Sequence, residues 1–124
     1  MTKPLALVLY ENLLPGSQLV NKLQDLNYRV YTIADAGALV DYARQKKPIL
    51  VLADLASSLT NVPVAIAKLK QNPDTKHLPV IAFATEEETE AREAARQAGA
   101  TLVVNDAAIL THLDQFLEQA LHVE

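Results

Sequence analysis

Acidic side chains follow three short apolar runs of the sequence, and these are the residues best placed to carry chemistry. They are Glu11, Asp54 and Asp106. In an open sheet of parallel strands, ligands bind beyond the carboxyl ends of the strands. If the apolar runs are strands of such a sheet, the three carboxylates can converge on one rim, where a small enzyme or a ligand-binding site could use them. Asp54 directly follows an unbroken apolar run, so it is interpreted either as a functional acid or as a cap of the following loop.

Other kinds of site have less support in the sequence. The turn expected after the first apolar run, residues 11–17, contains one glycine and matches neither G-x-G-x-x-G nor the G-x-x-x-x-G-K phosphate-binding loop. The absence of cysteine excludes thiolate zinc sites and cysteine nucleophiles. The three histidines, His77, His112 and His122, lack the mutual spacing of a metal site. We therefore expect neither NAD or ATP binding through such loops nor a histidine-based metal site.

The elements that must position the acids can be identified from hydrophobic periodicity. Five apolar runs predict β-strands: Leu5–Tyr10, Arg29–Ile33, Ile49–Ala53, Pro79–Ala84 and Thr101–Val104. Between and after these runs, apolar residues recur three and four positions apart, which predicts amphipathic helices. Strands that are nearly continuous in apolar residues and alternate with helices are typical of a parallel sheet covered on both faces. The expected fold is a single α/β domain over residues 1–124.

Residues that favour helix ends support this division. The segment 15–17, Pro-Gly-Ser, is expected to open the first helix, and Gly99 to end the fourth. Thr85 and Glu88 have the spacing of a capping box before the fourth helix. Asp106 is expected to cap the last helix.

The composition excludes several classes of protein. The 124 residues include 11 Lys and Arg against 15 Asp and Glu, a net charge of −4, and half of the residues are hydrophobic. Because no basic run is present, direct binding to nucleic acid is not expected. No apolar stretch approaches the length of about 18 residues that spans a membrane. We expect a soluble, cytoplasmic protein that does not associate with membranes.

Several segments of the sequence match one known family. They are Leu7–Glu11, Pro48–Asp54, Leu78–Phe83 and Gln97–Val104. Over almost the whole chain, the pattern resembles the receiver domain of the response regulators of two-component signal transduction. The resemblance implies the flavodoxin-like fold, a (βα)5 three-layer sandwich in which a five-stranded parallel sheet has the order 2-1-3-4-5.

The resemblance also implies roles for two of the acids. In receiver domains, an aspartate at the end of the third strand accepts a phosphoryl group from a histidine kinase, and acids at the end of the first strand help to hold Mg²⁺. Asp54 matches the phosphoacceptor, and Glu11 falls on the second acidic position, so Glu11 and Asp54 would be the metal ligands. Tyr10 falls on the first acidic position and cannot replace its carboxylate.

Four further positions of the family pattern depart from its usual residues. Ala84 stands where receivers have Thr or Ser, and Thr85 comes one residue late and is better explained as a helix cap. Asn105 stands in place of the lysine that contacts the phosphoryl group, and Leu102 in place of the switch aromatic. Loss of one preorganised donor to a developing charge typically costs about 10²–10³ in rate, so efficient phosphorylation is not expected.

These departures lead to two hypotheses. The first is a degenerate receiver, or pseudo-receiver, of phosphorelay type: a signalling module rather than an enzyme, which requires no cofactor and binds a protein partner, a histidine kinase or another signalling protein, without efficient phosphorylation. The alternative is an atypical but functional phosphoreceiver, with Asp54 as phosphoacceptor and Glu11 assisting Mg²⁺ binding. Receivers commonly pair through the fourth helix, fifth strand and fifth helix, and the resemblance implies a homodimer through the same surface.

Overall fold

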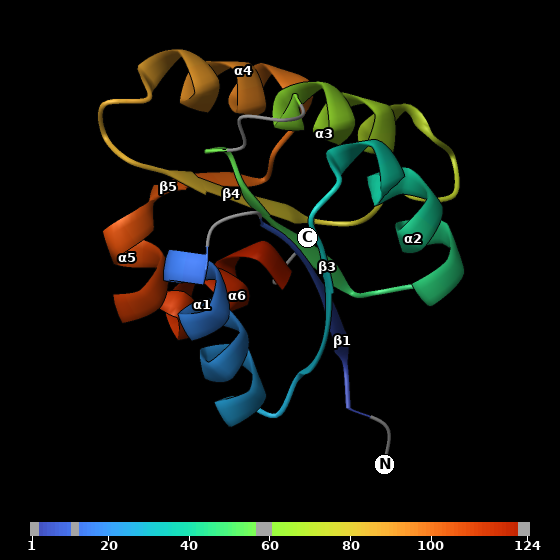
Figure 1. The fold of residues 1–124 in the computed structure, drawn as a ribbon. Helices are drawn as coiled ribbons and strands as arrows, with labels where there is room; N and C mark the ends of the chain where they lie inside the picture. Colours follow the sequence, from blue (N-terminus) through green and yellow to red (C-terminus); the bar gives the residue numbers. More distant parts are fainter. Residues whose placement is uncertain (1–2, 11–12, 57–60, 122–124) are drawn as a thin grey trace.

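Strands and helices alternate along the chain in the computed structural model, which describes residues 3–10, 13–56 and 61–121 (Figure 1). The elements within these ranges are β1 (Leu5–Leu9), α1 (Leu13–Asp25), β2 (Arg29–Ile33), the 3-10 helix η1 (Ala36–Ala38), α2 (Leu39–Lys46), β3 (Leu50–Asp54), α3 (Val62–Gln71), β4 (Val80–Ala84), α4 (Thr89–Ala98), β5 (Leu102–Asn105), α5 (Asp106–Thr111) and α6 (Leu113–Leu121). Each strand lies within one residue of its predicted bounds.

The strands of the described residues form one parallel sheet of five strands in the order β2-β1-β3-β4-β5. The flavodoxin-like strand order expected from the resemblance is therefore confirmed. Burial follows position in the sheet. The inner strands β1, β3 and β4 are buried at every residue, whereas the edge strands β2 and β5 are partly exposed. The nearly continuous apolar runs arise because an inner strand is covered on both faces.

The core is divided by the sheet into two layers. One face packs against η1, α2, α3 and α4, and its cluster includes Leu7, Leu39, Ile66 and Ala95. The other face packs against α1, α5 and α6, as Figure 1 shows for the helices drawn on either side of the sheet. Alternate residues of one strand enter different layers because successive side chains of a strand point to opposite faces.

Two helix ends have residues that are typical of caps. Asn61 caps α3, since its side chain accepts a hydrogen bond from the Val64 amide at 3.1 Å. Gly99 ends α4 in the left-handed conformation, with a φ of 109°. Glycine adopts this conformation without the steric cost that a Cβ atom imposes.

Other helix ends differ from the predictions. Helix α1 begins at Leu13, before the Pro-Gly-Ser segment expected to open it. Thr85 and Glu88 do not form a capping box, because α4 begins only at Thr89. Instead, the Thr85 hydroxyl donates to Glu88 Oε1 at 3.1 Å and the Glu88 amide donates to the Thr85 carbonyl, which closes a turn before the helix.

The last predicted helix is divided into two. Helix α5 ends at Thr111, and α6 begins at Leu113 after a break at His112. Asn105, and not Asp106, caps α5: its side chain accepts from the Ala107 amide at 2.8 Å, and Asp106 is the first helical residue. In the described part of the chain, no helix is both long and apolar enough to cross a membrane.

Candidate functional site

The carboxyl edge of the sheet brings together the strand ends identified in the sequence. Asp54 is the last residue of β3 and pairs with Phe83 of β4. Ala84 is the last residue of β4 and pairs with Asn105, the last residue of β5. Asp54, on the predicted phosphoacceptor position, therefore lies at the end of one of three consecutive strands, and Ala84 and Asn105, which depart from the family pattern, end the other two.

Asp54 is held at this edge by burial and by a local turn. Asp54 is 4% exposed, and its Oδ1 atom accepts a hydrogen bond from the Ala56 amide at 2.9 Å. An aspartate that accepts from the amide two residues later stabilises the turn that follows it. The loop-capping interpretation of Asp54 is confirmed for this oxygen, and capping does not prevent the carboxylate from also acting as a functional acid.

The segments that follow the strands at this edge carry no positive charge. They are residues 10–12, 34–35, 55–61 and 85–88, together with Asn105 at the end of β5, and their sequences contain neither lysine nor arginine. The ion pairs formed by the described residues, Arg44 with Asp74 and Arg96 with Glu93, connect other parts of the fold. A phosphoryl group at this rim would have to be stabilised without a cation from any of these segments.

Tyr10, on the first acidic position of the family pattern, packs against α1. A Cβ atom built on Gly16 would lie 2.1 Å from Cδ2 of the Tyr10 ring and 2.6 Å from its Cγ. The ring therefore lies directly over the backbone of the first turns of α1, as part of the cluster on that face of the sheet. Tyr10 therefore acts as a packing residue at the rim.

The four residues that depart from the family pattern at the ends of β4 and in β5 are all engaged in packing or in local hydrogen bonds. Ala84 is 1% exposed and has no polar side-chain group. Thr85 bonds with Glu88, and the Asn105 carboxamide caps α5. Leu102 pairs with Ile81 and packs against the cluster formed with α1, α5 and α6. The Asn105 cap was missed from the sequence, although an asparagine between a strand and a helix is a recognised signal for it.

The donors available for Mg²⁺ are incomplete in the described residues. Glu11, one of the two predicted ligands, lies outside the residues that the structure describes. The described ranges contain no group of three or more His, Asp or Glu side chains placed to hold a metal. Asp54 supplies one carboxylate at the end of β3, so the described part of the chain fits a Mg²⁺ ion only in part.

Asp106 is separated from Asp54 by one strand of the sheet. It follows β5, and β4 lies between β5 and β3 in the sheet. Two strand spacings of about 4.8 Å separate the two chain positions by about 10 Å. Asp54 and Asp106 therefore lie at the ends of strands that are not neighbours in the sheet.

Comparison with known proteins finds similarity among solved structures. No family model matches the sequence, and no curated protein matches it. Among solved structures, the receiver domain of the sensor histidine kinase PA1611 from Pseudomonas aeruginosa PAO1, with a magnesium ion coordinated in its active-site cleft, is similar with a TM-score of 0.88 and 20% identity. The match covers 98% of this chain and 100% of that one.

Two further solved structures are similar over most of the chain. A putative response regulator from Chloroflexus aurantiacus J-10-fl has a TM-score of 0.89 at 17% identity, with 98% of this chain and 100% of that chain covered. The chemotaxis response regulator CheY4 of Vibrio cholerae has a TM-score of 0.75 at 19% identity, with 92% and 98% covered. The receiver fold expected from the resemblance is confirmed by these likenesses.

Proposed function

We propose that the chain is a degenerate receiver module of two-component or phosphorelay signalling. It acts by binding a protein partner, a histidine kinase or another signalling protein, and is not efficiently phosphorylated. The proposal is supported by the receiver fold, by the similarity to receiver domains of a histidine kinase and of response regulators, and by the residues at the carboxyl edge of the sheet.

The observation that carries this proposal is the residue at position 105, an asparagine whose side chain caps α5. In the receiver pattern this position holds a lysine that neutralises the phosphoryl group, whereas here an uncharged carboxamide is used to cap α5. No neighbouring segment at this rim carries a lysine or arginine in its place. Because removal of one preorganised donor costs about 10²–10³ in rate, phosphorylation of Asp54 should be slow.

The other departures from the receiver pattern also disfavour phosphorylation and switching. Tyr10 replaces a metal-binding carboxylate by a ring packed on Gly16, and buried Ala84 offers no hydroxyl to a phosphoryl oxygen. Leu102 has no ring to change rotamer between two signalling states. These losses act on one site and are not additive, but together they remove both the charge stabilisation and the conformational switch.

The alternative function is an atypical but working phosphoreceiver. It is favoured by the burial of the Asp54 carboxylate at the end of β3, and by the magnesium ion coordinated in the active-site cleft of the similar PA1611 receiver domain. In this case Asp54 would be the nucleophile, and Glu11 and Asp54 would hold Mg²⁺, which prefers carboxylate and water oxygens. Bound Mg²⁺ would neutralise phosphoryl oxygens during transfer.

Intact-mass measurement distinguishes the two functions. The protein is incubated with acetyl phosphate and Mg²⁺, beside an Asp54→Ala variant and a receiver domain known to be phosphorylated as positive control. The degenerate receiver predicts little or no phosphorylated species. Stoichiometric addition of one phosphoryl group that disappears in Asp54→Ala would overturn the proposal and support the alternative, as would tightening of Mg²⁺ binding by beryllofluoride in calorimetry.

The proposed interaction partners are proteins, with no direct role for nucleic acid, for a membrane or for catalysis, and the proposed location is the cytoplasm. A homodimer would use α4, β5 and the α5–α6 pair. This surface includes an edge strand, β5, whose four residues are all partly exposed. Analytical ultracentrifugation tests the dimer: a monomer at all accessible concentrations would contradict it.

A further inference from the structure

An open groove of about 410 Å³ lies between α6 and the turn that joins α1 to β2. We call it the α1–α6 groove, after the two helices, which cover the same face of the sheet (Figure 1). Its turn leads into Arg29, the first residue of β2, which pairs with Leu5 at the start of β1. The groove is therefore at the amino edge of the sheet, whereas Asp54 is at the carboxyl edge. The lining residues are Leu26, Tyr28, Asp114, Leu117, Glu118 and Leu121.

The α1–α6 groove is mainly apolar. Leu117 is 4% exposed and belongs to the core cluster on this face of the sheet. Leu26, Tyr28 and Leu121 pack against the same cluster but remain partly exposed. The apolar side chains of the core thus continue to the surface at this place. Concave apolar surface with a polar rim is typical of a site where another molecule docks.

The charged residues of the lining are both acidic. Asp114 and Glu118 are exposed and lie one turn apart on α6, so their Cβ atoms are about 5–6 Å from each other. Asp114 uses one oxygen locally, since its Oδ1 accepts from the Gln115 amide at 3.0 Å. Two bases of the neighbouring segment, Lys22 and Arg29, do not line the groove. A concave surface whose charges have one sign attracts groups of the other sign.

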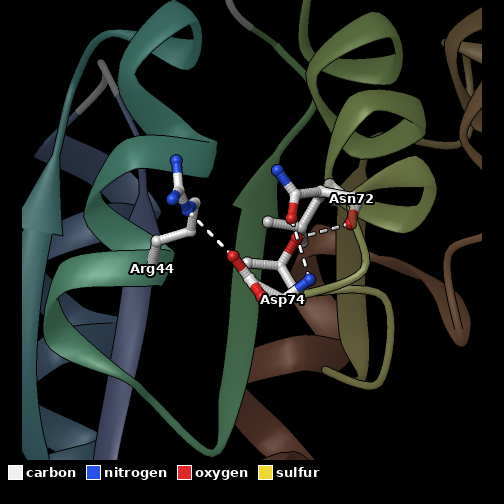
Figure 2. A network of polar contacts seen from close by, with 5 residues as sticks. Arg44, Asn72 and Asp74 are labelled. Carbon is white, nitrogen blue, oxygen red and sulfur yellow. Dashed lines mark hydrogen bonds and ion pairs between the residues drawn. The ribbon is translucent and has the colours of Figure 1, made fainter.

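The ion pairs formed by the described residues leave these acids unpaired. One pair lies within α4, and the other joins Arg44 Nε to Asp74 Oδ2 at 3.3 Å (Figure 2). The second pair belongs to a separate cavity of about 740 Å³, where two acids balance two bases; its titratable lining residues are Asp41, Arg44, Lys47, Asp74 and His77. The α1–α6 groove differs from this cavity in having acids alone and no ion pair to neutralise them.

We propose that the α1–α6 groove docks an amphipathic helix of a protein partner, with leucine-like side chains on one face and lysine or arginine beside them. The proposal rests on the proposed function, because this partner is the protein that the degenerate receiver binds. Apolar anchors of the helix would be buried against Leu26, Tyr28 and Leu121. A base of the helix would bind Asp114 and Glu118 together.

The spacing along α6 supports a helical partner. Apolar and acidic positions share one face of α6 between residues 114 and 121, because they are three or four residues apart. This face is about 10 Å long, at 1.5 Å per residue. A helix that docks in a groove uses anchors at positions i, i+3 or i+4, and i+7, which cover the same length.

The test is an NMR titration of the isotope-labelled chain with a synthetic peptide of about 14 residues. The peptide has leucines at positions i, i+3, i+4 and i+7 and arginines next to them. We expect saturable shifts of backbone amides within residues 24–30 and 113–121. The absence of saturable binding up to about 1 mM peptide, or shifts confined to other parts of the chain, would overturn the proposal.

Two control peptides test the stated chemistry of the partner. Replacement of the arginines by glutamates should weaken binding by about tenfold or more, because the rim repels them. Replacement of the leucines by serines should abolish saturable binding. Equal binding of either control would overturn the proposal, as would concentration-dependent shifts of the same amides without peptide, since these would show that a second copy of the chain fills the groove.

Variants of the chain separate the groove from general attraction by charge. Glu118→Gln should weaken binding of the arginine peptide by about two- to fivefold, and Leu121→Ala by about fivefold or more. Glu90→Gln makes the same change of charge at an exposed residue of α4, on the other face of the sheet. Its affinity should change by less than about 1.5-fold. Equal weakening by Glu118→Gln and Glu90→Gln would contradict the docking site.

Failure of this proposal can be told apart from failure of the proposed function. No peptide binding, together with no phosphorylation in the intact-mass measurement, would remove the docking site and leave the degenerate receiver. Peptide binding at the groove together with stoichiometric phosphorylation of Asp54 would support the docking site and overturn the degenerate receiver.

Discussion

Replacement of Gly16 by alanine tests the packing of Tyr10 at the rim most directly. The added Cβ would lie 2.1 Å from Cδ2, 2.5 Å from Cε2 and 2.6 Å from Cγ of the Tyr10 ring. Carbon atoms pack at about 3.5–4.0 Å, so either the ring must leave its place or α1 must shift. Overpacking of this kind typically costs about 1–3 kcal/mol.

Helix propensity opposes this cost. Gly16 lies inside α1, where alanine is favoured over glycine by up to about 1 kcal/mol. The steric effect is the larger, because three ring atoms are affected and the glycine is itself buried. We therefore expect Gly16→Ala to lower the free energy of unfolding by about 1–2 kcal/mol.

The effect of Gly16→Ala on stability should change sign when the Tyr10 ring is absent. In a Tyr10→Ala background, Gly16→Ala should raise the free energy of unfolding by about 0.5–1 kcal/mol, because only the propensity effect remains. Urea unfolding followed by circular dichroism measures all four proteins of this double-mutant cycle.

Gly37→Ala serves as the matched control. The atom nearest to its added Cβ is Oδ1 of Asp35, at 3.2 Å, at the end of a side chain that can move. It should therefore change the free energy of unfolding by less than about 1 kcal/mol. Stabilisation of the natural chain by Gly16→Ala, or equal destabilisation of both backgrounds, would refute the steric explanation.

Three further predictions concern helix ends and titration. Asn105→Ala should lower the free energy of unfolding by about 1 kcal/mol through loss of the α5 cap, and Asn105→Asp should cost less because it keeps an acceptor; equal losses in urea unfolding would contradict this. Thr75→Val should cost about 1–3 kcal/mol, because the fully buried hydroxyl donates to the Leu69 carbonyl at 2.6 Å; Thr75→Ser should retain most of that stability, and a loss as large as that of valine would exclude the hydrogen bond as the cause. Burial raises the pKa of the Tyr28 phenol above its ordinary value, so near pH 10 the unfolded chain loses this proton before the folded chain does, and stability falls as the pH rises. Tyr28→Phe should reduce the fall in urea midpoint between about pH 9 and pH 11, and an unchanged fall would disprove the assignment to Tyr28.

The strands could be predicted because their signal is local. Apolar runs such as 49–53 are nearly continuous, and only a strand covered on both faces requires that pattern. Helix ends were harder to predict, because more than one nearby residue could serve as the cap. Asn105 and Asp106 are both good caps, and the last residue of β5 takes the role because its backbone is still extended, with φ −74° and ψ 141°.

The sequence proposes the residue types of the candidate site, and the structure gives the positions of those that it describes. Asp54 was identified from a buried strand that ends in a carboxylate, and the structure places it at the carboxyl edge. That Asp106 belongs to a different part of this edge depends on β4 lying between the two strands. Strand order is decided by the packing of the whole sheet, and the spacing of acids along the sequence carries no measure of it.

The sequence by itself determined the alternation of strands and helices and the chemical character of each strand end, because periodicity and composition act within a few residues. The tertiary structure alone decided which side chains are engaged in packing or in hydrogen bonds, and which side chains from separate elements become neighbours. The Tyr10 ring packs on Gly16, and the Asn105 side chain caps α5. Arg44, Lys47 and His77 line one cavity. These contacts arise where separate elements pack together, and that packing is a property of the assembled fold and not of any one segment.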